Sequence, residues 1–185
     1  AELQGDVLQY LGEDIQTDFL KDMDAVDVLA ATENLEPDDV ADILQRLPNA
    51  VILEVLDSME AQERLRVETV LSFPEDTAGG LMNTDTITIR PDITLDVVLR
   101  YIRRHERLPD STDTLLVVSR RDEFIGALPI NRLLVSDPGV TVREVMDTDS
   151  VVIPALMPET EVASLFEKHD LISAPVVGGD GNLLG

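Results

Sequence analysis

The second half of the chain contains an internal repeat, and this repeat constrains the fold more than any other feature. The segment Met82–Asp85 returns as Met146–Asp149, and the pair Val117–Val118 returns as Val176–Val177. Each copy has the order strand, helix, strand, turn, strand when its apolar spacing is compared with the periods of helices and strands. The repeat therefore predicts two similar α/β units in tandem.

Apolar periodicity sets the expected elements of each copy. The helix is expected to begin at 92–94 in the first copy and near 158–159 in the second, and 131–135 predicts a closing helix in the first copy. The expected strands are 87–89, 115–118, 124–128, 151–153 and 174–177. The segments 115–118 and 174–177 are almost entirely apolar, which is typical of strands covered on both faces.

The first part of the chain, to about residue 72, predicts a set of short helices. Pro37 followed by Asp38 and Asp39 is a helix start, because proline suits the first turn and carboxylates suit the positive end of the helix dipole. The expected apolar faces are Val26/Leu29/Ala30, Val40/Ile43/Leu44/Leu47, Val51/Ile52/Val55/Leu56 and Leu65/Val67/Val70/Leu71. Short helices with one apolar face each suggest a superhelical stack of helical hairpins in which neighbours cover one another.

Negative charge dominates the composition. Lysine and arginine number 14 against 37 aspartates and glutamates, which gives a formal net charge of −23. Such a chain repels nucleic acid and attracts cations, although a solubilising, salt-adapted surface is the alternative interpretation. The chain has no cysteine, which excludes disulfides, thiolate metal sites and cysteine nucleophiles. With no Gly-x-Ser-x-Gly motif either, we expect no enzyme activity.

A hinge of unusual composition, residues 74–82, separates the two parts. Pro74 stops the preceding helix, and Gly79 and Gly80 permit backbone approaches that a Cβ would forbid. The fold class expected is α+β multidomain: an all-α superhelical stack followed by tandem β-α-β-β-α units. The expected boundaries are 1–73 for the acidic helical domain, 74–82 for the hinge, 83–139 for the first α/β unit and 140–185 for the second, which we expect to be incomplete.

The tandem units, each with Val-Val, a polar turn and then an apolar residue before glycine, resemble a pair of cystathionine-β-synthase (CBS) domains. Together with the acidic helical domain and the run Pro74–Gly79 joined to Leu81–Met82, the whole chain resembles the cytosolic region of MgtE-type magnesium transporters. The resemblance implies a Mg²⁺-sensing regulatory region, soluble in isolation, on the cytoplasmic side of the plasma membrane. It implies closure of the protein's own transmembrane pore when Mg²⁺ bridges the helical and CBS domains, and a homodimer formed through the CBS domains.

The resemblance also suggests metal-binding residues. By position, Asp38 matches an acidic metal-facing residue, with Glu36 and Asp39 close enough to share its role; Gly79 matches a backbone-carbonyl contact, and Asp170 matches an acidic residue on the CBS side. Oxygen ligands suit Mg²⁺, which keeps several of its waters. Stabilisation of a helix start is the alternative role for the first group. A carboxylate is unfavourable at a helix end, which favours a functional role for Asp170.

A second function stays open: an adenine-nucleotide-sensing CBS module of another effector protein, with ATP or AMP in the cleft between the copies. The usual pattern places Ser or Thr three residues after a glycine and Asp three residues later. Here Gly126 is followed by Pro129 and Arg132, so the hydroxyl and the carboxylate are both lost and only Arg132 is left to meet a phosphate. His105 and His169 end paired helices, where capping or packing explains them better than metal binding.

Overall fold

Two compact units make up the chain. The computed structural model describes residues 15, 20, 23–32, 35–105, 108–109 and 112–185. The first unit comprises residues 1–75 with 80–84, and the second comprises 76–79 with 85–185. Among the described residues, no helix combines the length and the apolar character needed to cross a bilayer.

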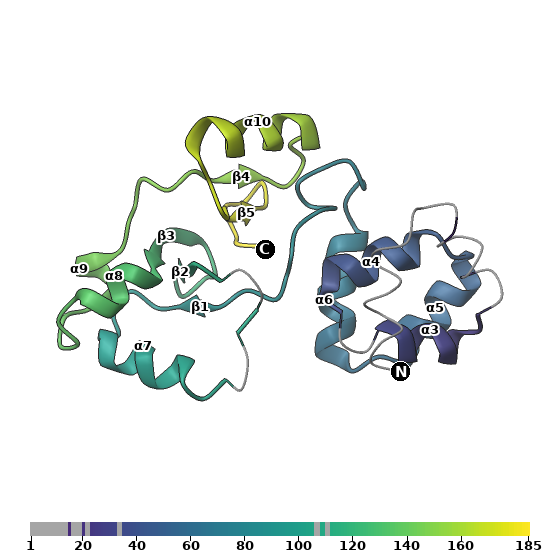
Figure 1. The fold of residues 1–185 in the computed structure, drawn as a ribbon, viewed down its shortest axis with the longest axis horizontal. Helices are drawn as coiled ribbons and strands as arrows, with labels where there is room; N and C mark the ends of the chain where they lie inside the picture. The colour runs from purple at the N-terminus through teal and green to yellow at the C-terminus, as the bar shows by residue number, and fades with distance from the viewer. Residues whose placement is uncertain (1–14, 16–19, 21–22, 33–34, 106–107, 110–111) are drawn as a thin grey trace. The chain divides into compact units, whose positions relative to one another are not determined.

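The first unit is helical, as the sequence predicts (Figure 1). Its described helices are α3 (Ala25–Thr32), α4 (Pro37–Gln45), α5 (Asn49–Ser58) and α6 (Ala61–Leu71). The principal contacts join α3 to α5 and α4 to α6, so each helix packs against the next but one along the chain. This arrangement covers an apolar face of each short helix.

The predicted apolar faces are correct for α4 and wrong for α3. Val40, Ile43 and Leu44 are buried, whereas Val26 is 73% exposed. The buried residues of α3 are Ala25, Val28, Ala31 and Thr32. Because α3 is apolar on several sides, its sequence is compatible with more than one face, and contact with α5 selects among them. The Thr32 hydroxyl donates to the Val28 carbonyl at 3.0 Å, so its burial leaves no unsatisfied donor. Leu65 of α6, also expected inside, is 65% exposed.

The first α/β copy is built on a three-stranded sheet with the order β1-β2-β3. Its elements are β1 (Thr88–Ile89), α7 (Leu95–Ile102), β2 (Thr114–Val118), β3 (Phe124–Pro129), α8 (Ile130–Val135) and α9 (Val142–Val145). β1 pairs with β2 in parallel, and β2 pairs with β3 antiparallel. All of these elements match the prediction within a few residues except α9, which the sequence analysis missed. Thr141 precedes α9, and its N–H donates to the Glu144 carboxylate at 2.8 Å.

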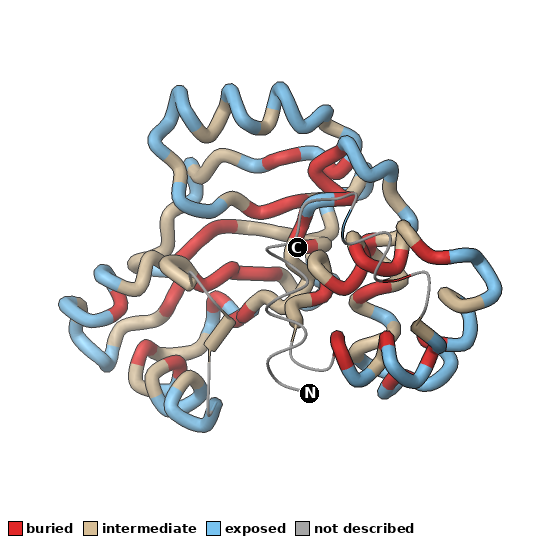
Figure 2. The backbone as a smooth tube through the Cα atoms, turned by 45° about the vertical axis from the view of Figure 1, so that its right-hand side comes forward, coloured by how far each residue is buried: buried red, intermediate tan, exposed pale blue. Residues whose placement is uncertain are grey.

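One aliphatic core supports this copy. Its buried members are Ile87, Ile89, Leu95, Val98, Leu115, Val117, Leu128, Leu133 and Val142. Apart from Ile87, which immediately precedes β1, they come from the strands and from α7, α8 and α9, so the helices share one apolar interior with the sheet. Within the second unit, Figure 2 shows buried residues along the strands. The core lacks aromatic side chains and depends on close aliphatic packing.

The second copy is smaller. It contains β4 (Ile153–Pro154), α10 (Glu159–His169) and β5 (Val176–Val177), and β4 pairs with β5 in parallel. The strand expected over 174–177 is therefore formed only in its second half. Pro175 immediately precedes β5, and proline has no N–H to donate to a ladder.

Main-chain hydrogen bonds join the two copies. The amide of Phe124 donates to the Gly181 carbonyl at 3.1 Å, and the amide of Leu183 donates to the Asp122 carbonyl at 3.0 Å. Ala127 and Asp147 form an isolated bridge. A Cβ on Gly126 would lie 2.7 Å from the Asp147 carbonyl oxygen, so glycine is required where these backbones meet.

The predicted hinge is divided between the units. Residues 76–79 lie beside the start of α10, where the Ala78 amide donates to the Met157 carbonyl at 2.9 Å and the Gly79 amide donates to the Ala155 carbonyl at 2.8 Å. Residues 80–84 belong to the helical unit, where the Asn83 side chain donates to Glu36. The stretch is thus anchored at both ends by hydrogen bonds.

Gly80 provides a test of this anchoring. A Cβ there would overlap the Pro74 carbonyl oxygen and lie 2.9 Å from the Glu75 Cα, whereas a Cβ on Gly179 would meet nothing within 4 Å. We expect Gly80→Ala to lower the free energy of unfolding by roughly 1–3 kcal/mol, because backbone cannot move aside cheaply. Urea unfolding measures this, with Gly179→Ala as the matched control. Equal stability of the two variants would contradict the close packing at Gly80.

Candidate functional site

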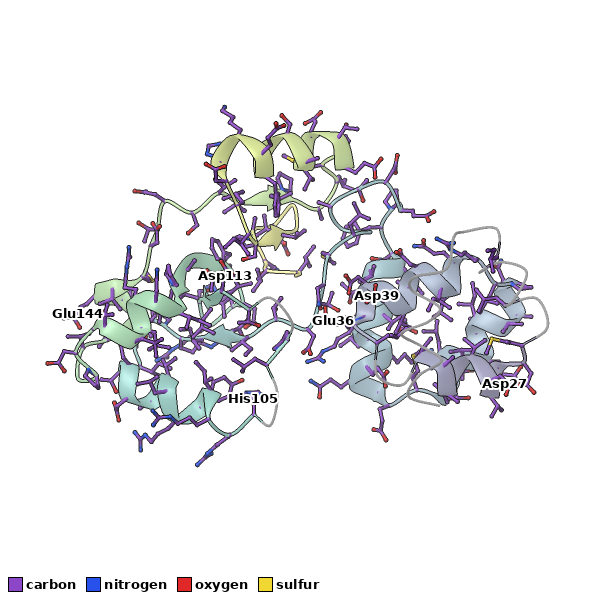
Figure 3. The ribbon with its side chains drawn as sticks, in the orientation of Figure 1. Asp27, Glu36, Asp39, His105, Asp113 and Glu144 are labelled. Atoms are coloured by element: carbon purple, nitrogen blue, oxygen red, sulfur yellow. The ribbon has the colours of Figure 1, made fainter. Side chains whose placement is uncertain are left out.

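The start of α4 gathers the acidic residues predicted from the sequence. Glu36 is the residue before the helix and has an extended backbone (φ −71°, ψ 154°), Pro37 begins the helix, and Asp38 and Asp39 lie in its first turn. Figure 3 shows Glu36 and Asp39 close together at this end of α4, away from Asp27. The sequence analysis missed Asp42, although its spacing of four residues from Asp38 places both on one helix face.

Asp38 has the most strongly raised carboxyl pKa of this group. Burial, the neighbouring Asp39 and Glu36 raise the pKa of its carboxyl from 3.8 to about 6, against smaller opposing effects of backbone hydrogen bonds. Its Oδ1 atom is buried and has no hydrogen-bond partner among the described residues. A buried, unsatisfied carboxylate oxygen costs folding free energy. A cation that reached this oxygen would remove that cost.

Two neighbouring carboxyls also have raised pKa values. Burial, Glu36 and Asp42 raise the pKa of Asp39. Burial and Glu75 raise the pKa of Asp42, and Arg46 lowers it. Three carboxyls along one helix are therefore harder to ionise than isolated ones, which is the electrostatic signature of a site that prefers added positive charge.

These carboxylates do not form a complete set of metal ligands. Within the described ranges, no three His, Cys, Asp or Glu side chains are placed to hold one metal ion together. Mg²⁺ does not need such a group, because it keeps several waters and commonly uses one or two carboxylates.

The other two predicted residues lie in the second unit. The Gly79 N–H donates a hydrogen bond to the Ala155 carbonyl. Asp170 ends α10 with a left-handed backbone (φ 50°, ψ 44°). Aspartate is among the residues that tolerate this conformation best after glycine, so ending the helix is a structural reason for a carboxylate there. No hydrogen bond or ion pair joins Gly79 to Asp170 in the described structure.

A cleft of about 360 Å³ lies between the two α/β copies. It runs from Thr114 at the start of β2 and Pro129 at the end of β3 to the residues around the end of α10. Among the described residues that line it, the acidic ones are Asp113, Asp147, Asp149 and Asp170, and the basic one is His169. The Ser173 hydroxyl donates to Asp113 at 2.6 Å across the cleft.

Arg132 and His105 do not contribute to this cleft. Arg132 donates to the Val145 carbonyl at 2.9 Å and is absent from the residues that line the cleft. The sequence-based suggestion that it meets a phosphate there is therefore not supported by its position. His105 follows α7 and packs edge-on against Tyr101 with ring centres 4.9 Å apart, as expected for a packing role.

Comparison with known proteins identifies the family. Residues 1–76 match the MgtE intracellular N domain, and residues 78–136 and 142–185 match the CBS domain. The fold matches a crystal structure of the cytosolic domain of the Mg²⁺ channel MgtE in complex with ATP, with a TM-score of 0.89 and 30% identity over 98% of this chain and 74% of that one. The chain belongs to the MgtE family. It corresponds to the cytosolic region of these transporters.

Full-length MgtE relatives extend well beyond this sequence. The magnesium transporter MgtE of Thermus thermophilus is 32% identical over 80% of this chain and 34% of its own length. That of Bacillus subtilis is 26% identical over 97% of this chain and 40% of its own length. The soluble part of another magnesium transporter has the same fold, with a TM-score of 0.86 at 19% identity over 98% of this chain and 72% of that one.

The raised pKa of Asp38 predicts a pH-dependent stability. An acid whose pKa is higher in the folded state stabilises that state at low pH, and the stabilisation is lost as the pH rises from about 4 through 6. We expect Asp38→Asn to be more stable than the wild type at pH 8 by about 1–3 kcal/mol, without metal, and nearly equal at pH 4. The range allows for partial solvation and for the lost interaction with the helix dipole.

Urea unfolding at the two pH values, in the presence of a chelator, measures this difference. Glu54→Gln is the matched control, because it removes one negative charge from an exposed position on α5 in the same unit. A gain in stability that is the same for both variants, or that is independent of pH, would contradict the burial-induced shift at Asp38.

Proposed function

We propose that this chain is a Mg²⁺ sensor that regulates the pore of an MgtE-type transporter. The observation that carries the proposal is the electrostatic state of α4: Asp38 has a pKa raised to about 6 and a buried oxygen without a partner, and it lies beside two more carboxyls with raised pKa values. Family membership supports Mg²⁺ as the cation, because the relatives are magnesium transporters.

The proposed mechanism is a population shift driven by charge. Without a divalent cation, the acidic helical and CBS domains repel each other in a chain of net charge −23. Mg²⁺, largely through its own waters, bridges oxygen atoms of the two domains. The carboxylates of Asp38, Glu36 and Asp39 lie on one side, and the Gly79 carbonyl and the Asp170 carboxylate lie on the other. Only tighter binding to the bridged state shifts the equilibrium, and that state holds the pore closed.

The proposal includes the setting of the chain. It acts at the cytoplasmic face of the membrane, its partner is the pore domain of the same polypeptide, and its CBS domains pair with those of a second copy. It carries out no chemistry on a substrate. The relatives that support this setting are magnesium transporters.

A scattering experiment tests the sensor. We expect millimolar Mg²⁺ to reduce the radius of gyration saturably at high constant ionic strength, because K⁺ at about 1 M shortens the Debye length to about 3 Å and screens general repulsion. Asp38→Asn and Asp170→Asn are expected to raise the Mg²⁺ midpoint severalfold. Asparagine preserves the left-handed backbone at residue 170, so the fold is retained.

Two further variants control for loss of charge alone. Glu54→Gln on α5 and Glu167→Gln on α10 each remove one exposed negative charge from the same units. They are expected to leave the midpoint nearly unchanged. Equal shifts of the midpoint in all four variants would show that the effect depends only on net charge. Unchanged midpoints in Asp38→Asn and Asp170→Asn would contradict the assignment of these residues to the Mg²⁺ site.

Adenine-nucleotide binding is the second candidate function, supported by the cleft of about 360 Å³ between the copies. The MgtE structure that this chain resembles was solved in complex with ATP. The described lining of this cleft is acidic, with four carboxylates and one histidine. We therefore propose that the nucleoside is held in the cleft while the phosphates are disfavoured unless a cation accompanies them.

The variant Asp149→Asn tests the binding of the phosphates separately from the binding of the nucleoside. Asp149 lines the cleft, and its backbone N–H donates to Asp147 at 2.9 Å, which the substitution keeps. We expect the variant to bind ATP severalfold more tightly than the wild type and adenosine with unchanged affinity, because one like charge is removed near the phosphates. Calorimetric titration measures both. Failure of adenosine to bind would exclude nucleoside recognition in the cleft.

A further inference from the structure

A second pocket, of about 540 Å³, opens at the opposite end of the first-copy sheet from the acidic cleft. Arg90 and Pro91, which follow β1, and Ser119 and Arg120, which follow β2, all line it. Since β1 and β2 are parallel, their carboxyl ends share one edge, where α/β sheets commonly bind ligands. The acidic cleft begins at Thr114, the other end of β2, so the two sites are separate.

The charge of this pocket is opposite to that of the protein. Of the eight described residues that line it, three are arginines (Arg90, Arg120 and Arg143) and one, Asp92, is acidic, so these residues carry a formal charge of +2. The whole chain has only 14 basic residues and a net charge of −23. A local concentration of guanidinium groups in such a chain attracts anions to this position and away from the rest of the surface.

The turn that carries Arg120 is held in place by hydrogen bonds. Arg90 donates to the Ser119 carbonyl and, at 2.9 Å, to the Asp122 carboxylate. The Asp122 amide donates to the Ser119 carbonyl at 3.1 Å, and Asp122 has a left-handed φ of 62°. Arg90 is thus a positioning residue that fixes the end of β1 to the β2–β3 turn, and its own charge is largely offset by Asp122.

Two guanidinium groups remain for a ligand. Arg120 is exposed and makes no side-chain hydrogen bond or ion pair with any described residue. Arg143 uses one nitrogen to contact Asp92 at 3.1 Å, and its side chain is 58% exposed. Planar guanidinium groups bind phosphoryl and carboxylate oxygens in pairs of parallel hydrogen bonds, which gives geometric selectivity as well as attraction.

The remaining lining is apolar. Pro91 is buried, and Ile93 and Ile125 are half-buried. The volume falls in the range of roughly 300–1,000 Å³ that is usual for small-molecule sites and exceeds what an inorganic phosphate fills. We infer that this pocket binds a small organic anion, with a phosphoryl or carboxylate head against Arg120 and Arg143 and a compact apolar body over the two isoleucines.

Phenyl phosphate is a suitable probe, because it combines both features. Titrated into the ¹⁵N-labelled chain, it is expected to produce saturable shifts of the amide signals of residues 119–122 and 92–93. Inorganic phosphate, which lacks the apolar body, and phenol, which lacks the charge, are expected to bind at least severalfold more weakly. Benzoate in place of phenyl phosphate shows which head group is preferred. Shifts confined to the acidic cleft, or none at millimolar concentration, would overturn the inference.

Neighbouring arginines provide the matched variants. Arg120→Gln is expected to weaken phenyl phosphate binding about tenfold, the effect of losing a charge-assisted hydrogen bond. Arg121→Gln removes the same charge from the next residue, which is exposed and does not line the pocket. It is expected to change the affinity less than about twofold, because a solvated charge outside the pocket is largely screened. Equal losses in the two variants would show general electrostatic attraction instead of a site and would overturn the proposal.

Discussion

Uncompensated negative charge is the constraint on which this structure depends. With 37 acidic and 14 basic residues, ion pairs cannot neutralise the surface. Pairs such as Arg64 with Asp57 at 2.6 Å and Arg143 with Asp92 at 3.1 Å are substantially exposed and contribute little stability each. Folding therefore relies on aliphatic burial. Ionisation of the Asp38 carboxyl in α4 costs the helical unit folding free energy. On our proposal, a bound cation removes this cost, so the unit responds to the cation.

Much of the fold was predictable because the determining signals are local or repeated. The repeat located β2 and β3, and Pro37 with its two aspartates located the start of α4. The failures have physical causes. The face of α3 is chosen by contact with α5, and β5 is shortened by Pro175. The short helix α9 lies in the connection between the copies, where its four residues give too little periodicity to detect.

Prediction of the candidate site was less complete. Sequence position placed Asp38 among other carboxyls, but only three-dimensional burial reveals that its pKa rises to about 6. Asp42 could have been found from helical spacing alone. The acidic cleft and the arginine-lined pocket both depend on residues distant in sequence, such as Asp92 and Arg143, which are 51 positions apart. Such sites arise from sheet topology, which no linear motif encodes.

The weak packing of α10 has a consequence for how the cleft responds to its contents. This helix, described over its whole length, buries none of its residues, and the β4–β5 pair beside it has only two paired positions, against five in the β2–β3 pair. We therefore expect amides of α10 to exchange with solvent by local opening, and those of β2 and β3 to exchange only when the copy unfolds. One wall of the cleft is a well-packed sheet, and the other is a helix with little burial. On the proposal that a ligand binds between them, we expect it to act by restraining α10, an entropic effect that needs no displacement of the average structure.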